Sequence, residues 1–282
     1  MRGRHAAGVL RACPVYHRRC DETAMTAMTT TRAMAWLLLS VALLTAGPLW
    51  MLAFGPASLR TEWRTATQRP TGLAPDPATH PEAIVQVYAG RAFNWRGAFA
   101  VHTWLAAKPA GADRYTRYEV IGWNALRGGS AVSISDFRAP DAEWYGATPG
   151  LVREVRGAVA DAVIARLPGA VASYPYPATY AAWPGPNSNT FLAHLGREIP
   201  ELRLTLPPIA IGKDYLPGGS IVARTPSGTG FQLSLGGILG VLAGRDEGFE
   251  LNVLGLVTGF DWRNPALKVP GIGRIPSSQP GA

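Results

Sequence analysis

The chain after residue 32 contains no cysteine, because both cysteines, Cys13 and Cys20, precede it. This absence excludes disulfide bonds, cysteine-ligated zinc and thiol catalysis from the folded body. Dense runs of lysine and arginine with interleaved aromatic residues are also missing. Six arginines against two acidic residues in the first 32 positions supply half of the net charge of +8. We therefore expect no nucleic-acid partner.

Several motifs of known chemistry are missing as well. No serine has the Gly-x-Ser-x-Gly setting, and Gly212-Lys213-Asp214 lacks the hydroxyl residue of a phosphate loop. The histidines of the body, His80, His102 and His194, have no partner at metal-ligand spacing. We expect no metal and no cofactor, and we interpret Lys213-Asp214 as a surface ion pair rather than as part of a cleft.

One long hydrophobic run is present. Residues 33–54 carry no charge, and as a helix they are long enough to cross a bilayer core of roughly 30 Å. The leader arginines precede this run, so the positive-inside rule predicts residues 1–32 in the cytoplasm and the body on the outer, periplasmic side of the inner membrane. We interpret the run as an uncleaved anchor, and a cleaved signal peptide is the alternative.

The rest of the chain predicts a linker and one globular domain. The 32 glycines and 24 prolines exclude an all-helical bundle. Proline-rich residues 55–81 are typical of an extended linker, residues 82–265 of a single domain, and residues 266–282 of an irregular tail. Within the domain, a turn at 244–248 predicts a β-hairpin over 239–253.

Alternation and helical spacing predict an α+β fold, with an antiparallel sheet packed against helices. Strands are expected at 84–88, 98–107, 115–123 and 131–135. In the second strand, His102 and Trp104 share one face. Thr148 and Pro149 begin a helix that reaches Val163, and a second helix runs from 188 to about 199.

The start of this second helix is a candidate catalytic site. Ser188 lies in its first turn, where free backbone N–H groups and the positive helix end can hold an oxyanion. If the helix packs on the strand of His102, the two form a Ser/His pair, and Glu119 or Tyr118 orients the imidazole. The structural alternatives are that Ser188 is a second cap beside Asn187 and that His102 is hydrogen-bonded in the core.

The motifs of the body resemble a bacterial family catalogued as domain of unknown function 3750. The resemblance covers Glu82–Tyr215 and implies membrane association. It rests on the segments Phe99–Trp104, Tyr118–Val120, Tyr174–Pro177, Trp183–Phe191 and Ile211–Tyr215.

A more distant resemblance concerns His102 followed by the segment from Asn187 to Phe191. This order is similar to that of the permuted papain-like hydrolases and acyltransferases of the NlpC/P60 and lecithin-retinol acyltransferase types, in which an Asn-Cys pair opens a helix. The resemblance implies a permuted papain-like fold, with Ser188 at the nucleophile position and His102 as the base. Serine stands here in place of cysteine.

Three functions follow as hypotheses. The first is a membrane-anchored serine hydrolase or acyltransferase acting on an ester or amide of the cell envelope. Asn187, Trp104, Trp123 and Tyr176 are then expected to contact the substrate. The second is a non-catalytic module whose aromatic groove binds an envelope peptide, glycan or lipid. The third is a structural envelope protein that uses the apolar hairpin around Leu239 as a partner surface.

Overall fold

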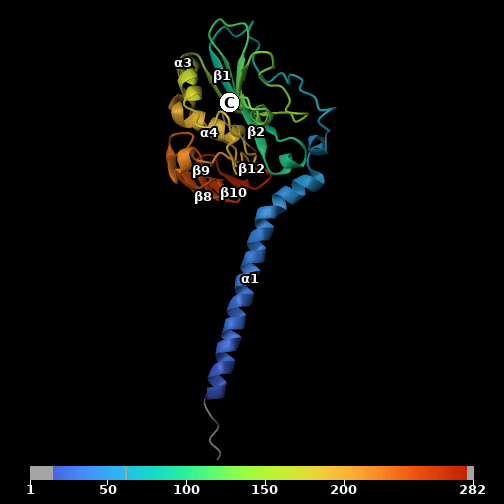
Figure 1. Ribbon diagram of the computed structural model, residues 1–282, viewed down its shortest axis with the longest axis vertical. Coiled ribbons are helices and arrows are strands. Elements are labelled where there is room, and N and C mark those ends of the chain that lie inside the picture. The colour runs from blue at the N-terminus through green and yellow to red at the C-terminus, as the bar shows by residue number, and fades with distance from the viewer. Residues whose placement is uncertain (1–14, 61, 278–282) are drawn as a thin grey trace, which may run out of the picture. The chain divides into compact units, whose positions relative to one another are not determined.

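The computed structural model describes residues 15–60 and 62–277. Helix α1 (Val15–Phe54) begins within the segment expected as a leader, and the boundary between two compact units falls inside it, between Leu43 and Leu44 (Figure 1). Among the described residues, one helical stretch, Thr30–Phe54, is long and apolar enough to cross a membrane, a property that signal sequences share. The predicted apolar helix is therefore confirmed.

The unit from Leu44 onward contains two antiparallel sheets. The first has the strand order β4-β3-β2-β1-β5. Four of its strands, β1 to β4, lie where alternation predicted strands. Its strands are β1 (Ile84–Arg91), β2 (Val101–Lys108), β3 (Thr116–Val120), β4 (Val132–Ser135) and β5 (Gly150–Arg156).

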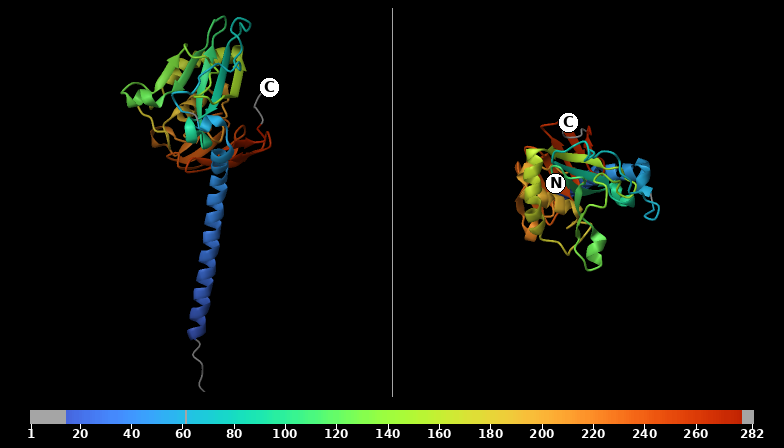
Figure 2. Two further views of the ribbon diagram at one scale, coloured as in Figure 1. Left: turned by 90° about the vertical axis from the view of Figure 1, so that its right-hand side faces the viewer. Right: turned by 90° about the horizontal axis from the view of Figure 1, so that it is seen from above.

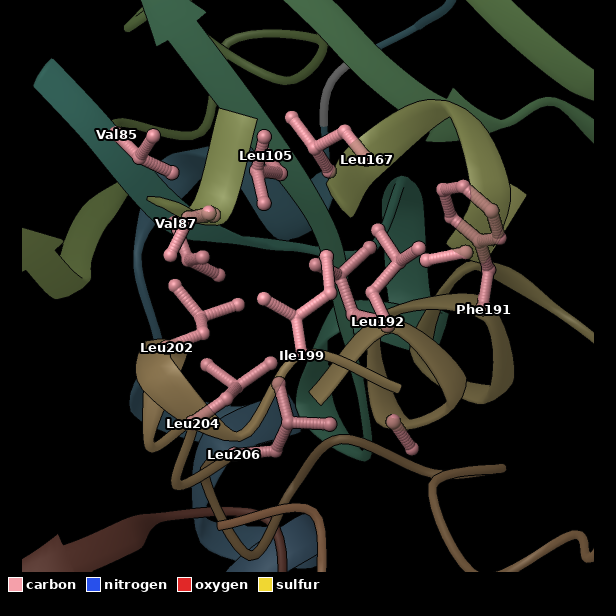
Figure 3. Close-up of a cluster of buried hydrophobic side chains, with 14 of the residues drawn as sticks. Val85, Val87, Leu105, Leu167, Phe191, Leu192, Ile199, Leu202, Leu204 and Leu206 are labelled. Carbon is pink, nitrogen blue, oxygen red and sulfur yellow. The ribbon is translucent and has the colours of Figure 1, made fainter. Parts of the chain in front are cut away.

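Helices α3 (Ala158–Ala172) and α4 (Ser188–Glu198) cover one face of this sheet. Figure 1 shows both helices beside β1 and β2, and Figure 3 shows Val85, Val87 and Leu105 of the sheet facing the side chains of the helices and of the segment after α4. Burial of these apolar side chains is the main stabilising contribution to this part of the fold.

The helix predicted from Thr148 to Val163 is wrong in its first half. Residues 150–156 form β5, which pairs antiparallel with β1, so that Val155 lies opposite Val85. Gly157, with a φ of 56°, then turns the chain into α3. A short segment can fit both a helical and a strand pattern of apolar residues. Here residues 150–156 pair with the edge of β1 and therefore form a strand.

The second sheet is a seven-stranded meander in sequence order from β6 to β12. The predicted hairpin over 239–253 is confirmed as β8 and β9. The tail expected to be irregular from residue 266 instead contains β11 and β12. Figure 2 shows this sheet as a layer separate from the first. The strands are β6 (Val222–Arg224), β7 (Gly230–Leu235), β8 (Leu239–Gly244), β9 (Gly248–Val253), β10 (Leu256–Asp261), β11 (Ala266–Val269) and β12 (Gly273–Ile275).

Short helices join these strands. The strand expected to reach Trp123 ends at Val120, and helix α2 begins at Gly122. The Gly122 backbone lies so close to the Tyr180 ring that a Cβ at this position would be 2.5 Å from a ring atom. The short helices are η1 (Ala57–Arg60), η2 (Asn94–Ala98), α2 (Gly122–Leu126), η3 (Pro200–Leu202) and η4 (Pro217–Gly219). The chain therefore has a mixed α+β fold with one N-terminal apolar helix.

The segment expected as a linker is attached to the loop before β5. The Thr71 hydroxyl donates to the Asp141 carbonyl at 2.8 Å, and the Leu73 N–H donates to the Asp141 carboxylate at 2.6 Å. The Gly146 N–H donates to the Thr67 carbonyl at 2.8 Å. This part of the segment is therefore bonded to the domain rather than free of it.

Candidate functional site

The chain enters α4 through a capping box centred on Asn187. The Asn187 side-chain oxygen accepts hydrogen bonds from the N–H groups of Asn189 at 2.9 Å and Thr190 at 3.2 Å, and the Asn187 N–H donates to the Thr190 hydroxyl. The Asn187 amide also donates to the carbonyls of Ala182 and Ile211. The predicted cap is therefore confirmed, and both ends of its side chain are bonded within the fold.

Ser188 follows directly and lies against one face of β2. The Thr103 hydroxyl donates to the Asn189 side chain at 2.9 Å and lies 3.4 Å from the Ser188 carbonyl oxygen, and the Asn189 amide donates to the Val101 carbonyl. The Ser188 residue is 6% exposed. Thr103 therefore marks the face of β2 that receives the first turn of α4.

His102 points to the opposite face of the first sheet, because successive side chains of a strand alternate. Its ring stacks on Trp144 with centroids 3.6 Å apart and an angle of 11° between the planes. The structure thus does not bring Ser188 and His102 together as a pair. The physical reason is that α4 buries its apolar stripe on the apolar face of β2, whereas the loop of Trp144 covers the face of His102.

Glu119 does lie beside His102, as the sequence predicted. The Glu119 Oε2 atom is 2.9 Å from His102 Nε2 and 2.9 Å from an Arg117 nitrogen, and Oε1 is 3.7 Å from Arg138. The Arg117 guanidinium lies 4.0 Å from the centre of the Trp104 ring. Three cationic or imidazole groups therefore converge on one buried carboxylate.

This environment sets the protonation states of the pair. Burial by itself would raise the Glu119 pKa, but the hydrogen bond from His102 and the charge of Arg117 lower that pKa to about 2. Burial lowers the pKa of His102, against the opposing effect of Glu119. At neutral pH the imidazole is uncharged, so Nε2 donates to the carboxylate and Nδ1 is an acceptor.

The other expected contact residues do not line one groove. Trp104 is fully buried, and its indole N–H donates to the Pro140 carbonyl at 2.7 Å. Trp123 is 39% exposed and stacks at 6.2 Å on Trp144. Tyr176 belongs to the other side of the sheet, where it packs against the core of α3 and α4 and donates to the Leu216 carbonyl. The predicted groove of Trp104, Trp123 and Tyr176 is therefore corrected.

Sequence reasoning missed several groups around His102. Arg117 could have been found, because it precedes Glu119 by two residues on one strand and so shares its face. Trp144 and Arg138 lie in an irregular loop, where no periodicity indicates which way a side chain points.

Lys213 and Asp214 form a buried ion pair, not the surface pair that the sequence indicated. They are 2% and 6% exposed, and the Lys213 ammonium bonds Asp214 at 3.3 Å and also contacts the Glu250 carboxylate. Lys268 bonds Glu250 at 2.6 Å. The Glu250 and Lys268 side chains come from β9 and β11, so the buried face of the second sheet is polar and charged.

The outer face of the second sheet is apolar. Along β7, Phe231, Leu233 and Leu235 are exposed, whereas the alternate residues Gln232 and Ser234 are buried. The strand registers place these outward side chains in continuous rows. One row consists of Val222, Leu233, Val241 and Leu251, and a second of Phe231, Ala243, Phe249, Phe260, Leu267 and Ile275.

This arrangement inverts the usual pattern of a half-buried sheet, in which apolar residues face the core. Exposed apolar residues that stand alone are ordinary, but a contiguous patch marks a surface that binds another apolar phase. The strongest functional feature of the described surface is therefore this outer face of the second sheet, from Val222 to Ile275.

Within the described residues, no three His, Cys, Asp or Glu side chains gather in a group that could hold a metal ion. The buried carboxylates Glu119 and Glu250 instead bond to arginine, lysine and histidine.

No curated protein and no solved structure matches the chain. One family model does match, over residues 82–215, and its description is protein of unknown function (DUF3750). The matched segment spans the first sheet, α3, α4 and the buried Lys213-Asp214 pair, and it ends before the second sheet. By this match, residues 82–215, which hold the first sheet and the two helices that cover it, are similar to the DUF3750 family.

Proposed function

We propose that this protein is a non-catalytic envelope module, anchored by α1 in the inner membrane, whose unit from Leu44 onward lies on the outer leaflet. The observation that carries the proposal is the apolar outer face of the second sheet. The occupant of that face is the lipid surface itself.

The position of the sheet beside the end of α1 supports this proposal. Gly47 and Pro48 are buried against the loop between β11 and β12, so closely that a Cβ at Gly271 would lie 2.6 Å from the Pro48 nitrogen. Thr30 to Ala46 leaves about 17 helical residues, or roughly 25 Å, for the bilayer core. The second sheet thus packs against Gly47 and Pro48, in the part of α1 that belongs to the same compact unit.

The charge of the sheet supports the same occupant. From β6 to β12 the exposed ionisable side chains are all arginines, Arg224, Arg245 and Arg263, whereas the acidic residues are buried or half-buried. Arg245 and Arg263 share the half-buried Asp246, and Arg224 forms no salt bridge with a described residue. Arginines around an apolar surface attract anionic lipid headgroups while the apolar side chains enter the interfacial region. A protein partner with an apolar face would not need this excess of one sign.

The geometry does not support a serine hydrolase. A Ser/His mechanism requires the imidazole within hydrogen-bond reach of the hydroxyl, and Ser188 and His102 lie on opposite faces of the first sheet. The permuted papain-like fold stays an expectation from the resemblance; its support is a capped helix packed on an antiparallel sheet.

The proposal is tested with the full chain in vesicles. A fluorescent probe is attached at Val241→Cys on the outer face, after Cys13→Ser and Cys20→Ser remove the other thiols. A matched probe at Ala110→Cys lies in the exposed loop between β2 and β3. With anionic vesicles carrying brominated acyl chains, we expect quenching of the Val241 probe and none of the Ala110 probe.

Two results would overturn the proposal. One is a Val241 probe that brominated lipid leaves unquenched and aqueous iodide quenches. The other is disulfide cross-linking between Val241→Cys copies in vesicles, which would assign the face to a second copy of the chain. The outward topology is checked with an impermeant maleimide, which should label Ala110→Cys in spheroplasts.

A further inference from the structure

A cavity of about 840 Å³ lies on the buried side of the second sheet, away from the apolar outer face. Its walls come from β1 and β5 of the first sheet, the segment 203–209 after η3, and β10 to β12. This volume is in the range of pockets that enclose a small amphiphilic or drug-sized molecule.

The cavity is lined by more cations than anions. Its acidic residues, Asp246, Glu247 and Asp261, face six basic ones. These are Arg91, Arg153, Arg203, Arg263, Lys268 and Arg274.

Most of these cations are already neutralised or bonded. Arg203 and Arg263 share Asp246, and Lys268 bonds Glu250. Arg274 bonds Asp261 at 2.9 Å, and Arg91 donates to three backbone carbonyls. The third acidic lining residue, Glu247, accepts hydrogen bonds from the Ser227 and Thr229 hydroxyls instead. The six basic lining residues outnumber the three acidic ones.

Among the described residues Arg91 and Arg153 both form no salt bridge, but Arg91 donates three hydrogen bonds to carbonyls and Arg153 donates one. Its Nε donates to the Leu202 carbonyl at 3.1 Å, and no carboxylate in the described part of the chain forms a salt bridge with it. Burial and then the neighbouring Arg203 lower the Arg153 pKa against the opposing charge of Asp246, but arginine stays charged at any physiological pH. A half-buried guanidinium that forms no salt bridge favours an anionic ligand, and its two terminal nitrogens can bind a phosphate or carboxylate.

An apolar wall adjoins this charge. Val152 flanks Arg153 on β5, and Ile272 comes from the loop before β12. Between them, the segment after η3 supplies Leu206, Pro207 and Ile209. A cavity with an excess of basic side chains, one of them an arginine with a single hydrogen bond, and an aliphatic wall fits a molecule that is anionic at one end and apolar along its length.

We propose that this cavity binds one anionic amphiphile, with a phosphate or carboxylate head on the Arg153 guanidinium and an acyl chain along the wall of Leu206, Pro207 and Ile272. The loop that carries Ile272 also holds Pro270 and Gly271, against which Gly47 and Pro48 of α1 pack. The cavity therefore adjoins the loop that packs on Gly47 and Pro48, within the apolar stretch of α1.

The test uses the full chain, delipidated in non-ionic detergent, and native mass spectrometry to count bound molecules. The probes are lysophosphatidic acid, lysophosphatidylcholine of the same chain length, and inorganic phosphate. We expect one lysophosphatidic acid per chain and weaker occupancy by the zwitterionic lipid. Arg153→Ala should weaken binding of the acid about tenfold, which corresponds to about 1.4 kcal/mol.

Three controls keep the inference falsifiable. Arg127→Ala removes an exposed arginine at the end of α2 and should leave binding unchanged. Arg153→Lys should restore part of the affinity, which separates charge from folding. Ile272→Ser should weaken the lysophospholipid without changing phosphate binding.

Equal binding of the anionic and zwitterionic lipids, or an Arg153→Ala variant that binds as wild type does, would reject the site. If inorganic phosphate competes for the cavity as strongly as lysophosphatidic acid does, the cavity is a site for small anions, and the proposal of an amphiphilic ligand is rejected. Neither result depends on whether the outer face touches a bilayer.

Discussion

Glu119 holds a negative charge at a position that is 1% exposed, and its neighbours explain how. Arg117 on the same strand, His102 on β2 and Arg138 from the following loop surround the carboxylate. A buried charge is tolerated only when its partners offset the lost hydration, and removal of one partner leaves the others uncompensated. This cluster therefore depends on every one of its members.

The first prediction concerns Glu119→Gln. The neutral amide leaves the buried Arg117 without a counter-ion, so we expect the free energy of unfolding to fall by about 3 to 5 kcal/mol. Denaturant unfolding of the full chain measures this change. Glu198→Gln, at an exposed carboxylate, is the matched control and should change stability by less than about 0.5 kcal/mol. A similar loss in both variants would contradict the account of the cluster.

A second prediction concerns pH. The folded-state pKa of His102 lies below that of the unfolded chain, about 6.5, so below pH 6.5 the unfolded state takes up a proton that the folded state refuses. The stabilising contribution is full above pH 6.5 and is lost as pH falls towards the folded-state pKa. The groups facing the imidazole, Glu119, Arg117 and Arg138, stay charged in this range.

Unfolding free energies from pH 8 to pH 5 measure the effect. His102→Gln retains an N–H donor for Glu119 but does not titrate, so its stability should depend less on pH over this window. Burial lowers the pKa of His194 as well, so a smaller dependence of the same sign should persist. An unchanged slope in His102→Gln would show that another group titrates.

At the scale of the element, α4 shows what a sequence motif can establish. The order Asn187, Ser188, Asn189, Thr190 predicted a helix start, and the structure has a complete capping box there. The same order of residues did not indicate which of these side chains belongs to a functional site. The Asn187 side chain bonds four residues of the fold, whereas the Ser188 hydroxyl makes no hydrogen bond with a described residue.

The third prediction compares these neighbours. Asn187→Ala removes the cap, which costs about 1 to 2 kcal/mol, and it leaves the Ala182 carbonyl without this donor. We expect a total loss above about 2 kcal/mol in the free energy of unfolding. Ser188→Ala should cost less than about 1 kcal/mol. The reverse order would show that Ser188, not Asn187, holds the start of α4.

At the scale of the whole molecule, the second sheet faces its polar residues inward and its apolar residues outward. The inward residues bond to one another and to the first layer, as Lys213 does with Glu250 and Arg197 with Gln232. The outward residues are exposed or half-buried. The face can therefore be altered without loss of the core.

The fourth prediction uses this difference. Leu233→Gln combined with Val241→Gln changes two outward neighbours on β7 and β8, and it should alter the free energy of unfolding by less than about 1 kcal/mol. The double variant should self-associate less after detergent removal, as size-exclusion chromatography measures. The matched control is Leu242→Gln, one residue along β8 but 3% exposed, which should destabilise by about 2 kcal/mol or more. Equal loss in both would mean that the outer face is covered.

The sequence by itself determined the features that depend on local order. Residues 33–54 are apolar over a bilayer length, Asn187 begins a helix, and the 244–248 turn joins two strands. Each of these features depends only on residues that lie close together in the sequence. His102 and Glu119 were also paired correctly, because both lie on adjacent strands with known alternation.

Only the tertiary structure decided which surfaces meet. It placed Ser188 and His102 on opposite faces of one sheet, converted residues 150–156 from helix to strand at the free edge of β1, and turned the apolar side of the second sheet outward. Such outcomes depend on packing between segments far apart in the chain, and a local pattern carries no information about which face of an element its distant partner covers.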